Sequence, residues 1–164
     1  MKHNGGWWVG LLVVGFTATA LPCLAAQATA RVGATIVSGL AITNVRSLEF
    51  GVIAPDAGGN VVVSPDGRRT AFGGARLLDS GDTTFSAEFA VKGAAGATYS
   101  VALPGSVVIT SGSDNMTVSD FSCTAPGSLA GGSTTLRVGA TLAVAANQPL
   151  GRYEGAFDVV VNYD

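Results

Sequence analysis

Hydrophobic and polar residues alternate with a period of two along most of the chain that follows residue 30. This alternation is typical of strands that have one buried face. Clusters of Gly, Pro, Asp and Ser, such as Ser64-Pro65-Asp66-Gly67, separate the alternating segments and predict tight turns. No window has a convincing helical period of about 3.6 residues. Many short strands with a turn every eight to twelve residues, roughly, predict an all-β fold, an antiparallel β-sandwich of immunoglobulin-like type.

The clearest strand is the last one, residues 153–163, which follows a turn containing Gly151. Its residues on one face are Tyr153, Gly155, Phe157, Val159, Val161 and Tyr163. Residues 31–42 also alternate, and one face there carries Val32, Ala34, Ile36, Ser38, Leu40 and Ile42. Inner segments predict strands at 84–92, 97–103 and 135–145, with Leu136, Val138, Ala140, Leu142 and Val144 facing inward in the last of these.

The first segment, residues 1–28, predicts a cleaved export signal. Lys2 and His3 precede an apolar stretch, and small residues then form a cleavage site near Ala26-Gln27-Ala28. A membrane anchor would need about 20 apolar residues, and Pro22 interrupts a shorter stretch. Lipid attachment at Cys23 is a weaker alternative, because Pro22 precedes it where a small residue is expected. We therefore expect an exported protein without an integral membrane span, located in the periplasm, on the outer surface or outside the cell.

The composition of the chain after residue 28 limits the reactions and binding sites that it can support. The net charge is −2 and charged residues make up 12% of the chain, which argues against nucleic acid as a partner. Beyond residue 28 there is no His or Trp, and Cys123 is the one cysteine. Catalytic Ser-His or Cys-His arrangements and imidazole metal sites are then impossible, and so is an internal disulfide. We expect no catalytic residue, cofactor or metal, and we expect the protein not to be an enzyme.

Weaker chemical alternatives rest on carboxylates and on the thiol. Oxygen ligands for calcium cluster around Asp79 and Asp82 and around Asp114, but such residues are also ordinary in turns. A glycosidase pair, for example Glu49 with Glu88, would lack an aromatic platform for a sugar. Cys123 fits a small buried hydrophobic residue better than a reactive thiol.

The C-terminus resembles the signature of chaperone–usher pilus subunits, with Tyr163 penultimate and Gly151 fourteenth from the end. The resemblance implies a pilin-like sandwich with a groove left by a missing strand. A periplasmic chaperone fills such a groove first, and then the N-terminal strand of another subunit does, by β-strand addition. The resemblance would place six residues at the groove: Gly151, Tyr153, Phe157, Val159, Val161 and Tyr163. The donor residues would be Val32, Ala34, Ile36, Leu40 and Ile42, in an extended segment 29–46 that precedes a sandwich at 47–164.

A broader resemblance covers nearly all of the chain after the export signal. It is carried by LEFG at 48–51, VVVSPDG at 61–67, GATYS at 96–100, VGATL at 138–142, NQPLGRY at 147–153 and VVVNY at 159–163. These segments are similar to the bacterial family called domain of unknown function 4402. The family implies a secreted or envelope β-sandwich without assigned chemistry. The early disulfide of the best-known pilins cannot form here.

Two functions remain open on the sequence alone. In the first, the protein is a structural subunit of a surface fibre joined by β-strand addition. In the second, it is a self-complete secreted β-sandwich that binds or adheres through its loops, and residues 29–42 pair within their own sheet. Alternation is required in both, so the pattern does not separate them.

Overall fold

In a computed structural model, the described residues are 31, 33, 34, 36, 38–78, 84–124 and 127–164. The chain divides into two units, residues 1–34 and 35–164, and every strand among the described residues lies in the second. The described residues contain antiparallel strands and no helix, which confirms the prediction of an all-β fold. The expected export signal at 1–28 and Val32 lie outside the described residues.

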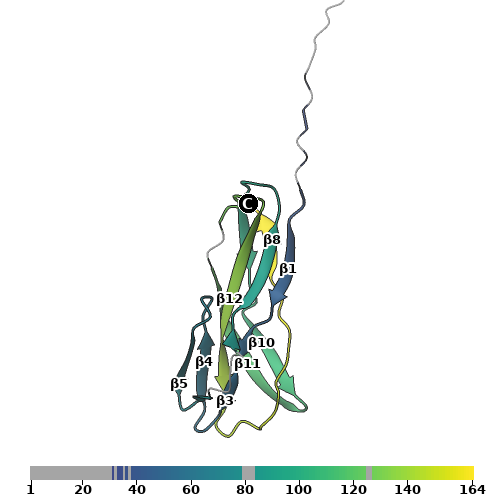
Figure 1. Cartoon of the computed structure of the whole chain (residues 1–164). Coiled ribbons are helices and arrows are strands. Elements are labelled where there is room, and N and C mark those ends of the chain that lie inside the picture. Colours follow the sequence, from purple (N-terminus) through teal and green to yellow (C-terminus); the bar gives the residue numbers. More distant parts are fainter. Residues whose placement is uncertain (1–30, 32, 35, 37, 79–83, 125–126) are drawn as a thin grey trace, which may run out of the picture. The chain divides into compact units, whose positions relative to one another are not determined.

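The main sheet contains seven strands (Figure 1). Its order is β1 (Ala41–Arg46), β8 (Ala87–Lys92), β12 (Ser133–Val144), β11 (Asp114–Cys123) and β10 (Ser106–Ser111), with β4 (Gly59–Val63) beside β12 and β5 (Arg69–Gly73) beside β4. The long strand β12 organises the sheet. Its first half pairs with β8 and its second half with β4 along one edge, while β11 pairs along the other.

Alternation in the sequence places the core on the inner face of this sheet. All five residues predicted to face inward in β12 are buried, and Val138 is fully so. Ala87, Phe89 and Val91 of β8 are buried beside them. Burying a Val, Leu or Phe side chain contributes about 1.5–3 kcal/mol, so each of these buried side chains stabilises the fold.

Short two-stranded ribbons cover the inner face. They are β9 (Tyr99–Ala102) with β13 (Val160–Tyr163), β2 (Glu49–Phe50) with β7 (Thr84–Phe85), and β3 (Val52–Ala54) with β6 (Arg76–Leu78). Val101 and Val161 pack on the core cluster around Phe89, and Phe50, Ile53 and Leu77 pack on the cluster around Leu142. This second layer is therefore made of separate pieces, unlike the continuous main sheet.

The structure corrects two predicted strands at the ends of the chain. The last segment, 153–163, is not one strand: Val160–Tyr163 pairs with β9, Glu154 forms an isolated bridge with Thr110, and residues 155–159 belong to no described ladder. The first ladder begins at Ala41, not at residue 31. Alternation records which side of an extended chain faces the core, and it does not require a neighbouring strand.

Candidate functional site

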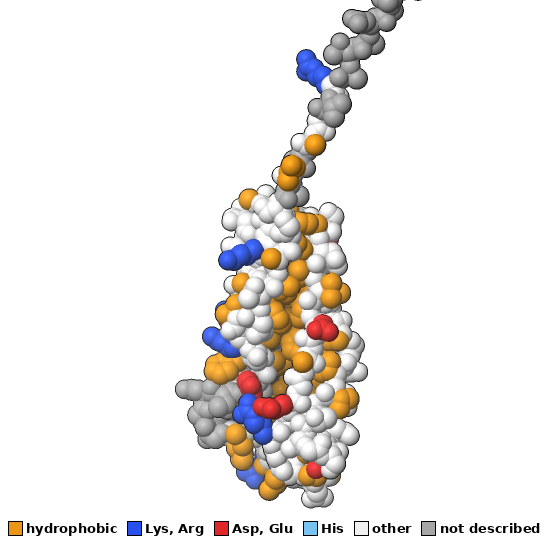
Figure 2. All heavy atoms as spheres, turned by 90° about the vertical axis from the view of Figure 1, so that its right-hand side faces the viewer, with side chains coloured by type: hydrophobic (Ala, Val, Ile, Leu, Met, Phe, Trp, Pro, Cys, Tyr) orange, Lys and Arg blue, Asp and Glu red, His pale blue; other side chains and the backbone are white. Residues whose placement is uncertain are grey.

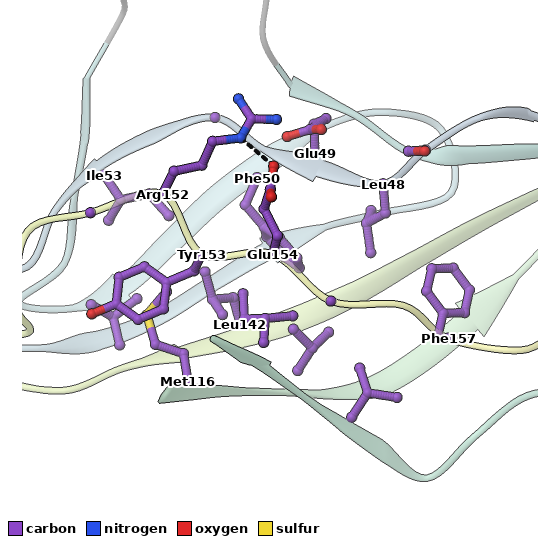
Figure 3. A pocket seen from close by; sticks show the side chains of 18 of the residues that line it. Leu48, Glu49, Phe50, Ile53, Met116, Leu142, Arg152, Tyr153, Glu154 and Phe157 are labelled. Carbon is purple, nitrogen blue, oxygen red and sulfur yellow. Dashed lines mark hydrogen bonds and ion pairs between the residues drawn. The ribbon is translucent and has the colours of Figure 1, made fainter. Parts of the chain in front are cut away.

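An open cleft of about 970 Å³, with an apolar floor and a partly polar rim, lies over the part of the core that the second layer leaves uncovered. One wall is formed by residues 47–55 and the other by residues 148–157. The floor comes from the inner face of the main sheet and includes Val107, Ile109, Met116, Val118, Leu142 and Val144. Figure 2 shows a hollowed stripe of hydrophobic side chains along this face of the molecule, and Figure 3 shows the cleft from close by, with Leu48, Phe50 and Ile53 from one wall and Tyr153 and Phe157 from the other.

The first wall continues from β1, which is an edge strand of the main sheet. A guanidinium group fastens this wall: Arg69 on β5 donates to the carbonyl oxygens of Phe50 at 3.0 Å, Val52 at 3.4 Å and Leu78 at 3.3 Å. Between the first two carbonyls, Gly51 has a φ of +74°, a conformation that glycine adopts at no steric cost. The clamp therefore fixes the bend between β2 and β3.

The second wall is the C-terminal segment, and its predicted alternation is confirmed in the exposure of its side chains. Glu154, Asp158 and Asn162 are exposed, whereas five aromatic or aliphatic side chains on the other face are half-buried: Tyr153, Phe157, Val159, Val161 and Tyr163. Phe157 contacts Phe89 edge-on at 6.1 Å between ring centroids and Phe121 at 5.0 Å. Of the residues predicted to form a groove, Gly151, Tyr153 and Phe157 line the cleft. Val159, Val161 and Tyr163 instead pack against the core cluster around Phe89.

Two glycines let the second wall lie directly against β10. A Cβ atom on Gly155 would meet Ile109 Cγ2 at 2.8 Å and the carbonyl oxygen of Val108 at 2.9 Å. A Cβ on Gly151 would likewise meet the side chain of Ser111. Glu154, next to Gly155, exchanges two backbone hydrogen bonds of 2.9 Å with Thr110 of β10. The role of Gly151 and Gly155 is therefore close approach.

Tyrosine hydroxyls fix both ends of this segment. The Tyr163 hydroxyl donates to the carbonyl oxygen of Ser38 at 2.8 Å and accepts from the amide of Ala94 at 2.8 Å. At the other end, the Tyr153 hydroxyl donates to the Pro149 carbonyl at 2.8 Å and accepts from Gln148 Nε2 at 3.0 Å. The C-terminal segment is thus held at its two ends, and its middle borders the cleft.

Charged side chains stand at the rim of the cleft. Arg152 pairs with Glu154, and this hydrogen bond, with the charges of Glu154 and Glu49, raises the pKa of the Arg152 guanidinium. All three side chains are exposed, so the pair contributes little to stability. Figure 3 places Glu49 on the opposite wall from Arg152 and Glu154.

The candidate donor residues separate into two groups. Leu40 and Ile42 pack against the protein's own core, and Ala41 and Ile42 pair with Lys92 and Val91 of β8. Ile36, in contrast, is 96% exposed, and Ala34 is exposed too. Val32 lies outside the described residues. Residues from Leu40 onward are therefore part of the chain's own core and main sheet.

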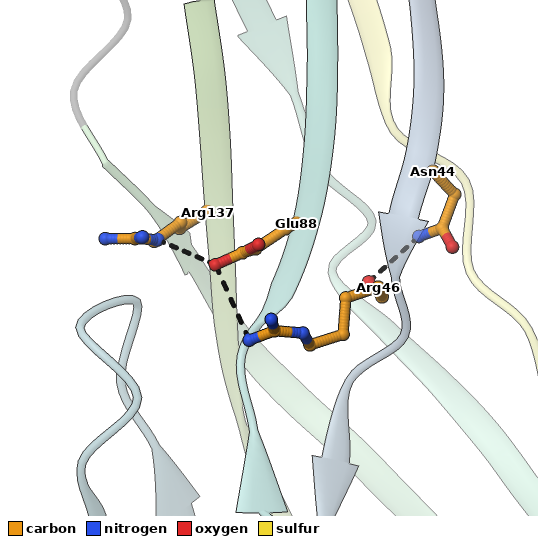
Figure 4. A network of polar contacts seen from close by, with 4 residues as sticks. All are labelled: Asn44, Arg46, Glu88 and Arg137. Carbon is orange, nitrogen blue, oxygen red and sulfur yellow. Dashed lines mark hydrogen bonds and ion pairs between the residues drawn. The ribbon is translucent and has the colours of Figure 1, made fainter.

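The carboxylates that the sequence offered as glycosidase or calcium-binding groups are the remaining candidates for chemistry. Glu88 accepts from Arg137 Nε at 3.0 Å and lies 3.7 Å from Arg46, so it links β1, β8 and β12 (Figure 4). Asp114 is the first residue of β11, where it pairs with Ser111 next to the tight turn after β10, and Asp79 and Asp82 lie outside the described residues. Within the described ranges no three His, Cys, Asp or Glu side chains gather as metal ligands.

Cys123 is half-buried and packs against the core cluster around Phe89, and burial raises the pKa of its thiol. A raised pKa keeps the thiol protonated and poorly nucleophilic. This agrees with the interpretation of Cys123 as a packing residue. No helix in the described part of the chain is long and apolar enough to cross a membrane.

Comparison with protein-family models identifies one match, over residues 40–163, which include both walls and the floor of the cleft. The chain belongs to the family Domain of unknown function (DUF4402). This confirms the resemblance that the sequence motifs indicated. Searches of curated proteins and of solved structures found no match. The DUF4402 match begins at Leu40, the residue from which the chain packs into its own core.

Sequence reasoning found the second wall of the cleft but missed the first wall and the floor. Leu48, Phe50, Met116 and Leu142 all have the alternation of ordinary core positions. The Arg69 clamp was missed as well, because an isolated arginine in a hairpin strand gives no signal for carbonyl partners about 20 residues away in sequence. Nothing in the linear pattern distinguishes a covered core residue from one that lines an open cleft.

Proposed function

We propose that this DUF4402 protein is an exported structural subunit of a surface fibre, joined to its neighbours by β-strand addition in the cleft. The observation that carries the proposal is a cleft with an apolar floor, bordered by chain segments whose backbones have free edges in the described structure. One border runs from Asn44 of the edge strand β1 into residues 47–55, and the other includes residues 155–157, which belong to no described ladder. An added strand would supply apolar side chains and main-chain hydrogen bonds together.

An extended segment suits this cleft better than a compact ligand does. Backbone amide and carbonyl groups are obligatory hydrogen-bonding groups, and an added strand satisfies those along 155–159. The half-buried row from Tyr153 to Tyr163 needs partners at every second position, which is the spacing of a strand. A strand here would also protect an exposed edge against aggregation.

The N-terminal segment of a second copy has the composition and length of such a strand. Residues 29–37, TARVGATIV, alternate with Val32, Ala34 and Ile36 on one face and contain one charge. Nine extended residues span about 30 Å, which is enough to run along the five residues 155–159 that belong to no described ladder. Because each subunit would give one strand and accept one, the contact is head-to-tail and generates an open fibre.

The proposal also covers where the protein is located, in the periplasm or at the cell surface, and which partner it binds first. Residues 1–28 would direct export and be removed, and the uncovered cleft would need protection before assembly. We infer a periplasmic chaperone that supplies a temporary strand. The function assigned is structural, and no catalytic role is included.

The test is assembly of a chain that begins at Thr29, measured by sedimentation and electron microscopy. Replacing Val32, Ala34 and Ile36 together by Ser should abolish fibres and leave a folded monomer, because the arm would lose its apolar face. Thr29→Ser, Thr35→Ser and Val37→Ser, at outward positions of the same segment, form the matched control and should assemble as the parent does. A parent chain that stays monomeric with and without a chaperone would overturn the proposal.

A second function is favoured by one observation. Residues 41–46 already pair with β8 of the same chain, so the domain is partly self-complete. A secreted monomer of this kind would use the cleft to bind an extended peptide from a different protein. Such a monomer should unfold reversibly without a chaperone. Its oligomeric state should not change when Val32, Ala34 and Ile36 are replaced.

A further inference from the structure

The faces of the two segments constrain how an added strand can lie, if the proposed function holds. In the C-terminal wall, the side chains of Tyr153 and Phe157 are half-buried at the cleft, whereas those of Glu154 and Asp158 are exposed. In residues 29–37 the even-numbered face is apolar throughout, with Val32, Ala34 and Ile36, and Arg31 falls on the odd-numbered face together with Val37. In a shared sheet, Arg31 would therefore lie on the same outer face as Glu154 and Asp158.

The two carboxylates are not equivalent partners for an arginine. Glu154 is already paired with Arg152. Asp158 is exposed and forms no ion pair with any described residue. A cation arriving in the cleft would gain an unused carboxylate at Asp158, whereas at Glu154 it would compete with Arg152 and be repelled by it.

Strand direction then decides which side chains meet. With Arg31 opposite Asp158 in an antiparallel pair, Val32 faces Phe157, Ala34 faces Gly155 and Ile36 faces Tyr153. All three apolar side chains enter the open part of the cleft. In a parallel pair Ile36 would instead reach Tyr163, which already binds the carbonyl oxygen of Ser38 in its own chain and packs on the same core cluster as Leu40 and Ile42.

We propose that the N-terminal segment of a second copy lies antiparallel to residues 153–158, with Arg31 opposite Asp158. This register specifies the partner as the same chain and gives Arg31 and Asp158 the role of setting its position. It rests on the proposed function and goes beyond it, since strand addition could occur in another register.

Single-cysteine chains test the register directly. Chains carrying Arg31→Cys and Asp158→Cys, each in a Cys123→Ala background and with tags of different length, are mixed, allowed to assemble and oxidised. Directly opposed antiparallel residues have Cα atoms about 4.5–5.5 Å apart, within the range of a disulfide. The matched control pairs Arg31→Cys with Glu154→Cys, which the proposed register separates by four positions, about 13 Å.

We expect the Arg31→Cys and Asp158→Cys chains to form a disulfide-linked heterodimer. The control pair should form little heterodimer. Preferential linkage of the control pair, or no linkage in chains that sediment as fibres, would overturn the register and leave strand addition standing. Failure of the parent to sediment as fibres would overturn the proposed function itself.

Charge reversal gives a second measurement on the full chain. Asp158→Arg should weaken subunit association about fivefold, equivalent to about 1 kcal/mol for a cross-strand charge pair, and Arg31→Asp in the same chain should restore it. Equal association of all three chains would contradict the assigned pair.

Discussion

Gly155→Ala tests whether the C-terminal wall is held against β10 by the absence of a side chain. The new Cβ would lie 2.8 Å from Ile109 Cγ2 and 2.9 Å from the Val108 carbonyl oxygen, both inside van der Waals contact. The carbonyl belongs to the backbone of a paired strand and cannot turn away. The wall must therefore move outward, away from β10.

The expected cost follows from three contributions. Overpacking by one methyl group costs about 1–3 kcal/mol. The lower entropy of the unfolded Ala chain returns about 0.4–1 kcal/mol. Weakening the two 2.9 Å hydrogen bonds between Thr110 and Glu154 adds up to about 1 kcal/mol each. The net loss in unfolding free energy is about 1–3 kcal/mol, or about 0.5–1.5 M in the urea midpoint at an m-value near 2 kcal/mol/M.

Urea unfolding and amide hydrogen exchange measure the two parts of this effect. Gly105→Ala is the matched control, because a Cβ there would meet nothing within 4 Å, and it should change stability by less than about 0.5 kcal/mol. The amides of Thr110 and Glu154 should exchange faster in Gly155→Ala alone. Equal midpoints for the two variants, with unchanged protection at Thr110, would refute the close-approach reasoning.

Two further predictions concern the end of the wall and the thiol. Tyr163→Phe removes the hydrogen bonds to Ser38 and Ala94, so we expect a loss of about 1 kcal/mol in unfolding free energy and faster exchange at the Ala94 amide; unchanged exchange there would contradict the assigned contact. Burial raises the pKa of the Cys123 thiol, so iodoacetamide at pH 8 should alkylate the native chain more slowly than the urea-unfolded chain, and the native rate should still increase above pH 9; equal rates at pH 8 would contradict this.

The parts of the fold that the sequence predicts well are those with one buried and one exposed face inside the main sheet. In β12, the residues from Leu136 to Val144 that were expected to face inward are buried, and β8 follows the same rule. The hairpin around Ser64–Gly67 joins β4 to β5 as the turn residues indicated. In these elements the local pattern and the tertiary packing require the same residues.

The alternation did not predict which strand pairs with which, or where a segment lacks a partner and leaves the core uncovered. The segment 153–163 has the expected faces, yet 155–159 pairs with no described strand, because an alternating pattern records the faces of an extended chain and not its pairing partners. The short strands β3 and β6 were missed because three residues are too few to show a period. The cleft depends on what fails to cover the core, and a single sequence carries no record of that.

The central place of β12 has a consequence for the kinetics of folding. Three neighbours, β8, β4 and β11, depend on it, and its pairs include residues as distant in sequence as Val61 and Leu142. A chain released from its N-terminus can form the β4–β5 and β10–β11 hairpins early, but it cannot join them into one sheet until about residue 144 is free. Contacts of such long range make folding slow. The main sheet therefore cannot close until the polypeptide has been released as far as Val144, the end of β12.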